Sequence, residues 1–452
     1  MRTTTSTAYA VRLLTGVPTH GVGVRKDLPL PFGVLLGAAL LVLAISFGAV
    51  AFLWREPRLR PSDGVPMPGW TARILDSRFL RRALRALVLV LAAWVGIALV
   101  FGADTARNPT ANVIYVWFWV GLAFVSMLFG PVWRLLNPLR LLHRGLLRLA
   151  GVDPETTAST YQLGLWPAAL GLAAFAWVEL VADDHTGLGF LRIAVGVYVA
   201  ITLLGALTFG AVWFDRADPF EAWSRLLGLL SPLGRRDDGR WVLRTPLHGV
   251  NALAAHPGLV ATVSVMLGST AYDAFSANLT WAEFVHDSGV PPVLSEAGAL
   301  LAFFLLVGAT LGLAALVSVR LTRTPVATAP QFASQLAASL IPIAGGYVVA
   351  HYWSLFVYQG QVTVALLSDP FGQGPDLLGL GGFTPNSSLI EPTFVASLQA
   401  GVIIVGHFLG VLAAHERAIT LLDRRSAVVG QVPLMVLMIA YTLGGLVLLF
   451  TP

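Results

Sequence analysis

Long apolar stretches alternate with short polar ones along most of the chain. From about Pro31 onward there are ten runs of roughly 20 apolar residues, the length that a helix needs to cross the ~30 Å hydrocarbon core of a bilayer. Because backbone groups in lipid must be satisfied within their own segment, each run predicts a transmembrane helix. The predicted spans are residues 31–54, 86–103, 113–131, 164–182, 191–212, 257–276, 298–319, 335–358, 393–414 and 429–450.

This pattern predicts an all-α, polytopic integral membrane helix bundle over residues 31–452. A polar, mixed segment precedes it over residues 1–30, without the apolar run and the small-residue cleavage site of a signal peptide. We therefore expect residues 1–30 to form an extracytoplasmic tail ahead of a single transmembrane bundle.

The arginines predict the orientation of the bundle. Five loops hold 8, 4, 6, 2 and 3 arginines, which is 23 of the 29 basic residues. These loops are residues 55–85, 132–160, 212–255, 320–329 and 415–427. They alternate strictly along the ten spans, so they share one side, and the positive-inside rule makes that side the cytoplasm. Both termini are then expected outside.

Two of these arginine-rich loops carry an internal repeat. FGPVWRLLNPLR begins at Phe129 and FGAVWFDRADPF at Phe209, and each reaches an Asn-Pro or Asp-Pro step that favours a helix start. The repeat predicts cytoplasmic amphipathic elbows near residues 132–160 and 212–255, in contact with anionic lipid headgroups.

Composition supports the membrane assignment. The chain is 56% hydrophobic and 12% charged, with a mean hydropathy of +0.75, whereas globular proteins average about 25% charged residues. It has no cysteine, which excludes disulfides, thiolate metal sites, iron–sulfur clusters and covalently attached haem.

The predicted outer side is rich in carboxylates. Its acidic residues are Asp27, Asp104, Glu179, Asp183, Asp184, Asp273, Glu283, Asp287, Glu296, Asp369, Asp376 and Glu391. Such a surface suits a cation, a metal ion or a cationic substrate. The alternative is that outer loops are simply polar and poor in arginine.

Two histidines lie inside predicted spans. His351 and His407 are placed where an ordinary span would carry leucine, and ionisable side chains in a bilayer usually mark a functional site or path. Each could bind a metal, carry a proton or donate to a backbone carbonyl. Gly406 and Gly410 beside His407 form a small-residue ridge, which predicts that this imidazole faces a neighbouring helix.

Glu179 and Asp273 are the carboxylates closest to the hydrophobic zone, each within about one turn of an outer helix end. With His351 they form the candidate catalytic set, suited to general acid and base chemistry. With His407 added, the same residues form the candidate ligand set for a divalent metal ion. The sequence does not show whether these helices touch.

Several other chemistries lack support. His415 lies in HERAI, where Ile419 replaces the second histidine of a metalloprotease helix, so we expect His415 and Glu416 at the solvated cytoplasmic rim. The nucleotide-binding loop GxxxxGK[ST] does not occur. Only His351 and His407 could hold a haem within the membrane, and the short basic loops, interrupted by acids, do not favour nucleic acid.

Five segments are distinctive enough to compare with known proteins. They are HGVGVRKDLPLP, FGPVWRLLNPLR, RADPFEAWSRLLGLLSPLGRR, AHYWSLFVYQGQ with SDPFGQG, and GHFLGVLAAHERA. In these segments the chain resembles a family of actinobacterial multi-pass membrane proteins labelled fenitrothion hydrolase. The resemblance spans nearly the whole chain and implies hydrolysis of a phosphotriester, which generally needs a water activated on a metal.

Two functions are therefore predicted for a protein of the bacterial plasma membrane. By resemblance, the first is a membrane hydrolase of organophosphate-type esters, with the site in the outer half of the bundle. The second is a transporter or an ion- or metal-handling protein that uses its intramembrane histidines. Either would bind a small molecule or ion; the oligomeric state is not indicated by the sequence.

Overall fold

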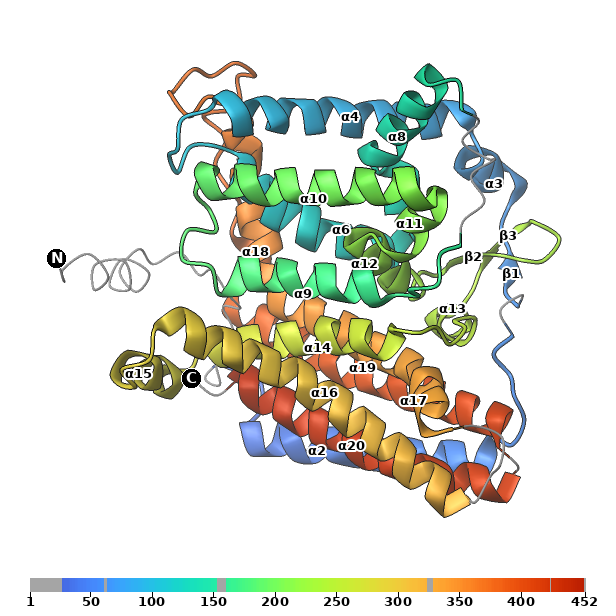
Figure 1. Ribbon diagram of the computed structural model, residues 1–452. Helices are drawn as coiled ribbons and strands as arrows, with labels where there is room; N and C mark the ends of the chain where they lie inside the picture. Colours follow the sequence, from blue (N-terminus) through green and yellow to red (C-terminus); the bar gives the residue numbers. More distant parts are fainter. Residues whose placement is uncertain (1–26, 61–62, 153–159, 323–327, 423, 451–452) are drawn as a thin grey trace.

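The computed structural model describes residues 27–60, 63–152, 160–322, 328–422 and 424–450, and these residues are mostly helical, with very little strand. Among them, eight helices are long and apolar enough to cross a membrane (Figure 1). Five of them are single helices: α2 (Phe32–Leu53), α10 (Leu188–Phe209), α16 (Pro292–Thr322), α19 (Pro392–Leu421) and α20 (Arg424–Phe450). The other three are each built from consecutive elements. They are α3 (Gly69–Leu75) with α4 (Arg78–Phe101); α5 (Thr110–Asn112), η2 (Val113–Val120) and α6 (Gly121–Phe129); and α17 (Ala329–Ala337), η3 (Ala338–Leu340) and α18 (Ile341–Leu366).

Helices α9 (Trp166–Leu180) and α14 (Leu259–Ser276) occupy the other two predicted spans. Helix α9 has only 15 residues, and α14 includes Ser264, Ser269, Thr270 and Asp273 among its 18 residues. Neither is among the eight helices that length and composition single out. Every predicted span is therefore helical, and the two weakest spans carry the two predicted carboxylates.

The remaining elements are short and lie mostly between the long helices. They are α7 (Trp133–Leu136), α8 (Pro138–Leu149), α11 (Ala211–Arg216), α12 (Pro219–Gly228), α13 (Pro246–Asn251), α15 (Leu279–Asp287) and η4 (Ser388–Ile390), with strands β1 (Val65–Pro66), β2 (Leu233–Arg235) and β3 (Trp241–Leu243). The strands form a small antiparallel sheet of order β1-β3-β2, which the sequence did not predict.

The outside of the bundle is apolar. Large hydrophobic side chains are exposed on several long helices, including Leu41 on α2, Ile193 on α10 and Leu305 on α16. Soluble proteins rarely expose apolar patches on this scale. The exposed surface and the eight apolar helices together indicate a multi-pass membrane protein.

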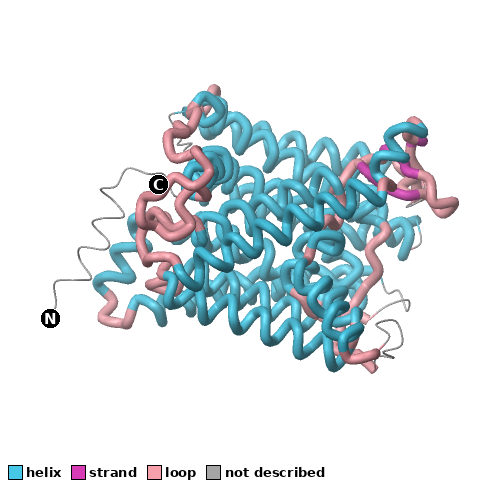
Figure 2. Tube along the Cα trace, turned by 90° about the horizontal axis from the view of Figure 1, so that it is seen from above, coloured by secondary structure: helices cyan, strands magenta, loops and turns pink. Residues whose placement is uncertain are grey.

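The helices run between two loop-rich ends (Figure 2). At one end, Arg85 donates to the carbonyl of Leu135, and Arg417 donates to the carbonyl of Leu253. Four of the five arginine-bearing loops are joined directly by these contacts and by the pairing of β1 with β3. We call this the arginine-rich end; it lies on the right of Figure 1.

The opposite end gathers acidic loops. The Ala103 amide donates to the Phe371 carbonyl, and the Leu188 amide donates to Asp104. We call this the acidic end. The rings of Phe32 and Phe450 lie 6.2 Å apart there, so both ends of the described chain are together. Most of the predicted tail, residues 1–30, lies outside the described residues.

The two copies of the repeat form equivalent local structures. Gly130 and Gly210 have φ values of 90° and 70°, in the region that favours glycine, and each breaks its long helix before the elbow. Asn137 then caps α8 by accepting from Leu139, and Asp218 caps α12 by accepting from Phe220.

The two elbows contact each other through matching positions. Asn137 Nδ2 donates to Asp218 Oδ2 at 2.9 Å, and three residues further Arg140 forms a two-pronged ion pair with Glu221. Arg140 also reaches Asp215 at 2.6 Å. The copies have therefore diverged to complementary charges where they meet, with Arg140 and Glu221 both buried.

One elbow differs from its prediction. Amphipathic α8 exposes Leu149 on the surface, whereas every residue of α12 except Arg225 is buried. Helix α12 packs against α6 and α9, and Trp223 stacks on Trp119 with their ring centroids 4.1 Å apart. The second elbow is thus part of the protein core rather than a helix at the lipid interface.

The prediction that His415 and Glu416 lie at a solvated rim is wrong. Both are buried, because the chain after α2 crosses over them. Glu416 Oε1 accepts from the amides of Arg58 and Leu59, both at 2.7 Å, and His415 Nε2 bonds to the Trp54 carbonyl. These two side chains therefore hold residues 54–59 against α19 through hydrogen bonds.

Replacing Glu416 by alanine should release that segment. Two backbone amides would lose their acceptor, and a buried unsatisfied group costs about 1–3 kcal/mol, so local opening should become roughly tenfold or more frequent. We expect trypsin to cleave after Arg55 and Arg58 faster by a similar factor. The exposed Glu283→Ala variant should be cleaved like the wild type; equal rates for both variants would contradict this role of Glu416.

Candidate functional site

Three helices bring the predicted catalytic residues together. Helix α14 packs against both α9 and α18. Each of the three contributes one candidate: Glu179 from α9, Asp273 from α14 and His351 from α18. Glu179 and Asp273 both lie in the last turn or so of their helices, toward the acidic end, as the sequence predicted.

Asp273 is the centre of the cluster. Its Oδ2 atom lies 2.8 Å from Nε2 of His351 and accepts a hydrogen bond of 2.8 Å from the Tyr352 hydroxyl. All three residues are buried, with 1%, 3% and 4% exposed. The two rings meet edge to face, with centroids 4.9 Å apart. Two consecutive residues of α18 thus contact the same carboxylate oxygen.

Glu179 is half-buried beside this pair. Its charge acts on Asp273, on Tyr352 and on Tyr115, so all of these groups lie within electrostatic reach. Two carboxyls so close in a low-dielectric setting resist being ionised together. A charge on one of them therefore disfavours a charge on the other.

Tyr115 links the cluster to the acidic end. Its hydroxyl donates to the His185 carbonyl at 2.7 Å, and its ring meets the His185 ring edge to face at 5.7 Å. Tyr115 lies in η2, a stretch of π-helix, whose wider turn is frequent at functional sites. The same stretch carries Trp119, which stacks on Trp223 of the buried elbow.

The four predicted metal ligands do not form a ligand group. Among the described residues, no three histidines or acids are placed to hold one metal ion. Asp273 and His351 are near each other, but their facing atoms already bond to each other. The arrangement does not fit a resident metal ion.

His407 is placed apart from the cluster. It is fully buried in α19, with Nδ1 bonded to the Ile403 carbonyl at 2.9 Å and its ring facing Tyr347. The predicted small-residue ridge does bring helices close: a side chain at Gly406 would come within 2.7 Å of the Pro342 carbonyl of α18. His407 therefore lies beside a close contact of α18 and α19 and bonds to its own helix rather than to Asp273 or His351.

Tyrosines were missed by sequence reasoning. Neither Tyr352 nor Tyr115 is among the candidate residues that the sequence indicated. A hydroxyl inside an apolar span needs a partner, so Tyr352, next to an intramembrane histidine, was the available signal. For Tyr115 the signal is weaker, since only the fold brings it to Glu179.

Comparisons of the chain with protein-family models, curated proteins and solved structures find no match.

Proposed function

We propose that the protein is a proton-linked membrane carrier for cations, with Asp273 as the group that exchanges protons. The observation that carries the proposal is the Asp273 carboxylate, buried among helices and held by His351 and Tyr352. Intramembrane acids in pumps and carriers commonly form proton relays. Here the imidazole is a second proton acceptor at hydrogen-bond distance.

A coupled pair of carboxyls suits exchange of a proton for a cation. Glu179 and Asp273 repel each other when both are charged, so binding one proton or one cation between them relieves that repulsion. Either ligand would exclude the other, which is the basic requirement for exchange. Glu179, less buried than Asp273, would face the acidic end first.

A small aromatic cavity at the same end of α14, which Asp273 itself does not line, supports a cationic substrate. Ala274 and Phe275, directly after Asp273, line a cavity of about 440 Å³ together with Trp281 and Phe284. Aromatic faces attract organic cations. The cavity lies toward the acidic end, which the positive-inside rule would place outside the plasma membrane.

A hydrolase of phosphotriesters remains the alternative that the resemblance implies. It generally calls for a water activated by a metal. The cluster does not offer a metal ligand group among the described residues, so the geometry adds no support to that alternative. Proton exchange needs only the groups that are already in contact.

Transport in reconstituted vesicles tests the proposal. Vesicles containing the full-length protein, with an acidic lumen and the membrane potential clamped by valinomycin and equal potassium, would receive external tetraphenylphosphonium, a permanently charged organic cation. We expect accumulation beyond that of protein-free vesicles, and its collapse when a protonophore is added. Accumulation that equals the protein-free control, or that ignores the protonophore, would contradict the proposal.

A further inference from the structure

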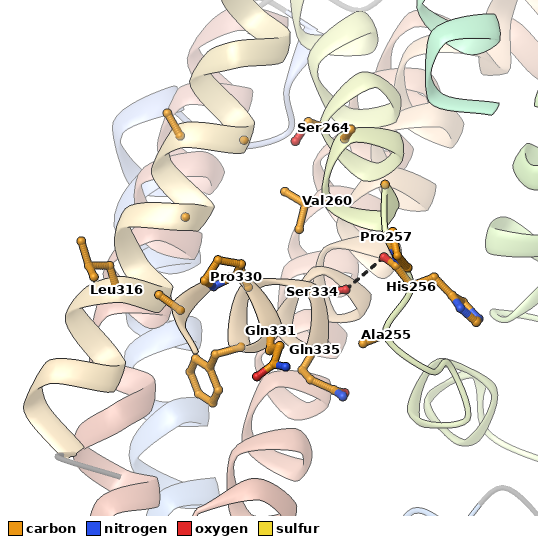
Figure 3. A pocket seen from close by; sticks show the side chains of 18 of the residues that line it. Ala255, His256, Pro257, Val260, Ser264, Leu316, Pro330, Gln331, Ser334 and Gln335 are labelled. Atoms are coloured by element: carbon orange, nitrogen blue, oxygen red, sulfur yellow. Dashed lines mark hydrogen bonds between the residues drawn. The ribbon is translucent and has the colours of Figure 1, made fainter. Parts of the chain in front are cut away.

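A large cavity lies between α14, α16 and α17, away from the Asp273 cluster. Its volume is about 1320 Å³. Figure 3 shows α16 and α14 as its two walls, with Leu316 on the first and Val260 on the second, and α17 crossing below. Helices α14 and α16 touch toward the acidic end, where a side chain at Gly268 would meet Phe303. Further along, α17 contacts both helices, and the cavity lies where they separate.

The cavity faces the lipid. Leu305, which lines it, is 62% exposed, and Gly308 and Gly312 on α16 have no side chains to occupy the space. No atom lies within 4 Å of where a side chain would begin at Gly312. Trp166, half-exposed at the start of α9, also lines it. Tryptophan at this kind of position marks the level of the lipid headgroups.

One end of the cavity is polar. Gln331, Ser334 and Gln335 of α17 line it opposite His256, and Ser334 donates to the His256 carbonyl (Figure 3). Burial lowers the pKa of His256, as do the charges of Arg216 and Arg225. The imidazole is therefore neutral near pH 7, and neither arginine lines the cavity. The start of α17 adds the partial positive charge of a helix N-terminus.

Ser264 provides an unused donor deeper in the cavity. It lines the cavity, is 4% exposed, and its hydroxyl has no hydrogen-bond partner. It lies five residues into α14, roughly 7 Å from the start of the helix at 1.5 Å per residue. A buried hydroxyl usually finds a partner, so this position calls for an acceptor from a bound molecule.

We propose that this cavity binds an anionic glycerophospholipid from the leaflet at the arginine-rich end. One acyl chain lies along Val260 and Leu316, a chain ester accepts from Ser264, and the phosphate lies near the start of α17. A phospholipid matches the order of these features: apolar at the middle of the bilayer, an ester below and an anion at the rim. The site is separate from the Asp273 cluster and does not depend on the proposed transport.

Two matched variants of α16 test this site. Gly312→Leu would place a branched side chain inside the cavity, whereas Gly298→Leu adds the same side chain to the same helix outside it, where space is equally open. Native mass spectrometry of the full-length protein, incubated with phosphatidylglycerol and exchanged into mild detergent, would count retained lipids. We expect one retained phosphatidylglycerol in the wild type and in Gly298→Leu, and at least a tenfold loss of occupancy in Gly312→Leu.

The roles of Ser264 and of the lipid charge can be tested separately. Ser264→Ala, a small change that should leave folding intact, should weaken retention several-fold. Phosphatidylcholine, which has the same chains but no net charge, should be retained much less than phosphatidylglycerol. Equal retention of the two lipids would overturn the anionic specificity. Equal occupancy in Gly312→Leu and Gly298→Leu, or no retained lipid in the wild type, would overturn the site.

Discussion

Replacing Asp273 by asparagine is expected to abolish proton-linked uptake while leaving the fold in place. Asparagine has nearly the same shape and its amide oxygen can still accept from Tyr352, but it cannot take up or release a proton. Positioned acid–base groups contribute about 10²–10⁴-fold to rates. The initial rate of tetraphenylphosphonium accumulation should therefore fall by at least about 100-fold.

The partners of Asp273 should show graded effects in the same vesicles. His351→Gln removes the second proton acceptor and should slow uptake strongly, whereas Tyr352→Phe removes one hydrogen bond and should slow it less. Asp287→Asn, an exposed acid at the acidic end, is the matched control and should transport like the wild type. Uptake by Asp273→Asn at the control rate would exclude Asp273 as the exchanging group.

Replacing Glu221 by alanine is expected to destabilise the protein by about 3–5 kcal/mol, the usual effect of removing one partner from a buried ion pair. Arg140 would remain buried with only the half-exposed Asp215 to pair with. This pair joins the two elbows, so its loss should also loosen α12 from α8. Unfolding of the detergent-solubilised protein by dodecyl sulfate, followed by tryptophan fluorescence, measures the effect.

Two comparisons separate the buried pair from charge in general. Asp238 pairs with Arg240 on the surface, and Asp238→Ala should change stability by less than about 1 kcal/mol. Replacing Arg140 by methionine and Glu221 by leucine together should restore much of the stability lost in Glu221→Ala, because no buried charge is left unpaired. A double variant as unstable as Glu221→Ala would argue against this explanation.

The helices could be predicted because each depends on its own sequence. A run of about 20 apolar residues in lipid has no alternative to a helix. All ten predicted spans are helical, including α9 and α14, although Glu179 and Asp273 weaken their apolar character. The arginine-bearing loops whose contacts are described also lie together at one end of the bundle. This could be predicted because the positive-inside rule depends only on where the arginines fall between the spans.

The contacts of the site could not be predicted to the same degree. Sequence reasoning named Asp273 and His351 as candidates, but their bond joins residues 78 positions apart and depends on how α14 meets α18. A histidine in an apolar run looks the same whether it faces a carboxylate, as His351 does, or a backbone carbonyl, as His407 does. Only the neighbouring helix decides between these partners.

Two further differences have the same origin. The sequence places His415 and Glu416 at a charged rim, yet residues 54–59 cover them. Helix α12 has the polar caps of an interfacial helix, yet the other elbow supplies partners for those caps inside the bundle. Local sequence shows that a polar side chain requires a hydrogen-bond or ion-pair partner, and tertiary contacts determine whether water or another part of the protein provides it.

Infrared difference spectroscopy of the full-length protein in bilayers is the most direct test of Asp273 as a proton-exchanging group. Acidification of the wild type should produce, among the carbonyl bands of its protonated carboxylic acids, one band with accompanying histidine ring changes that is missing from the Asp273→Asn spectrum. Superimposable wild-type and Asp273→Asn spectra across the whole pH range would contradict the account.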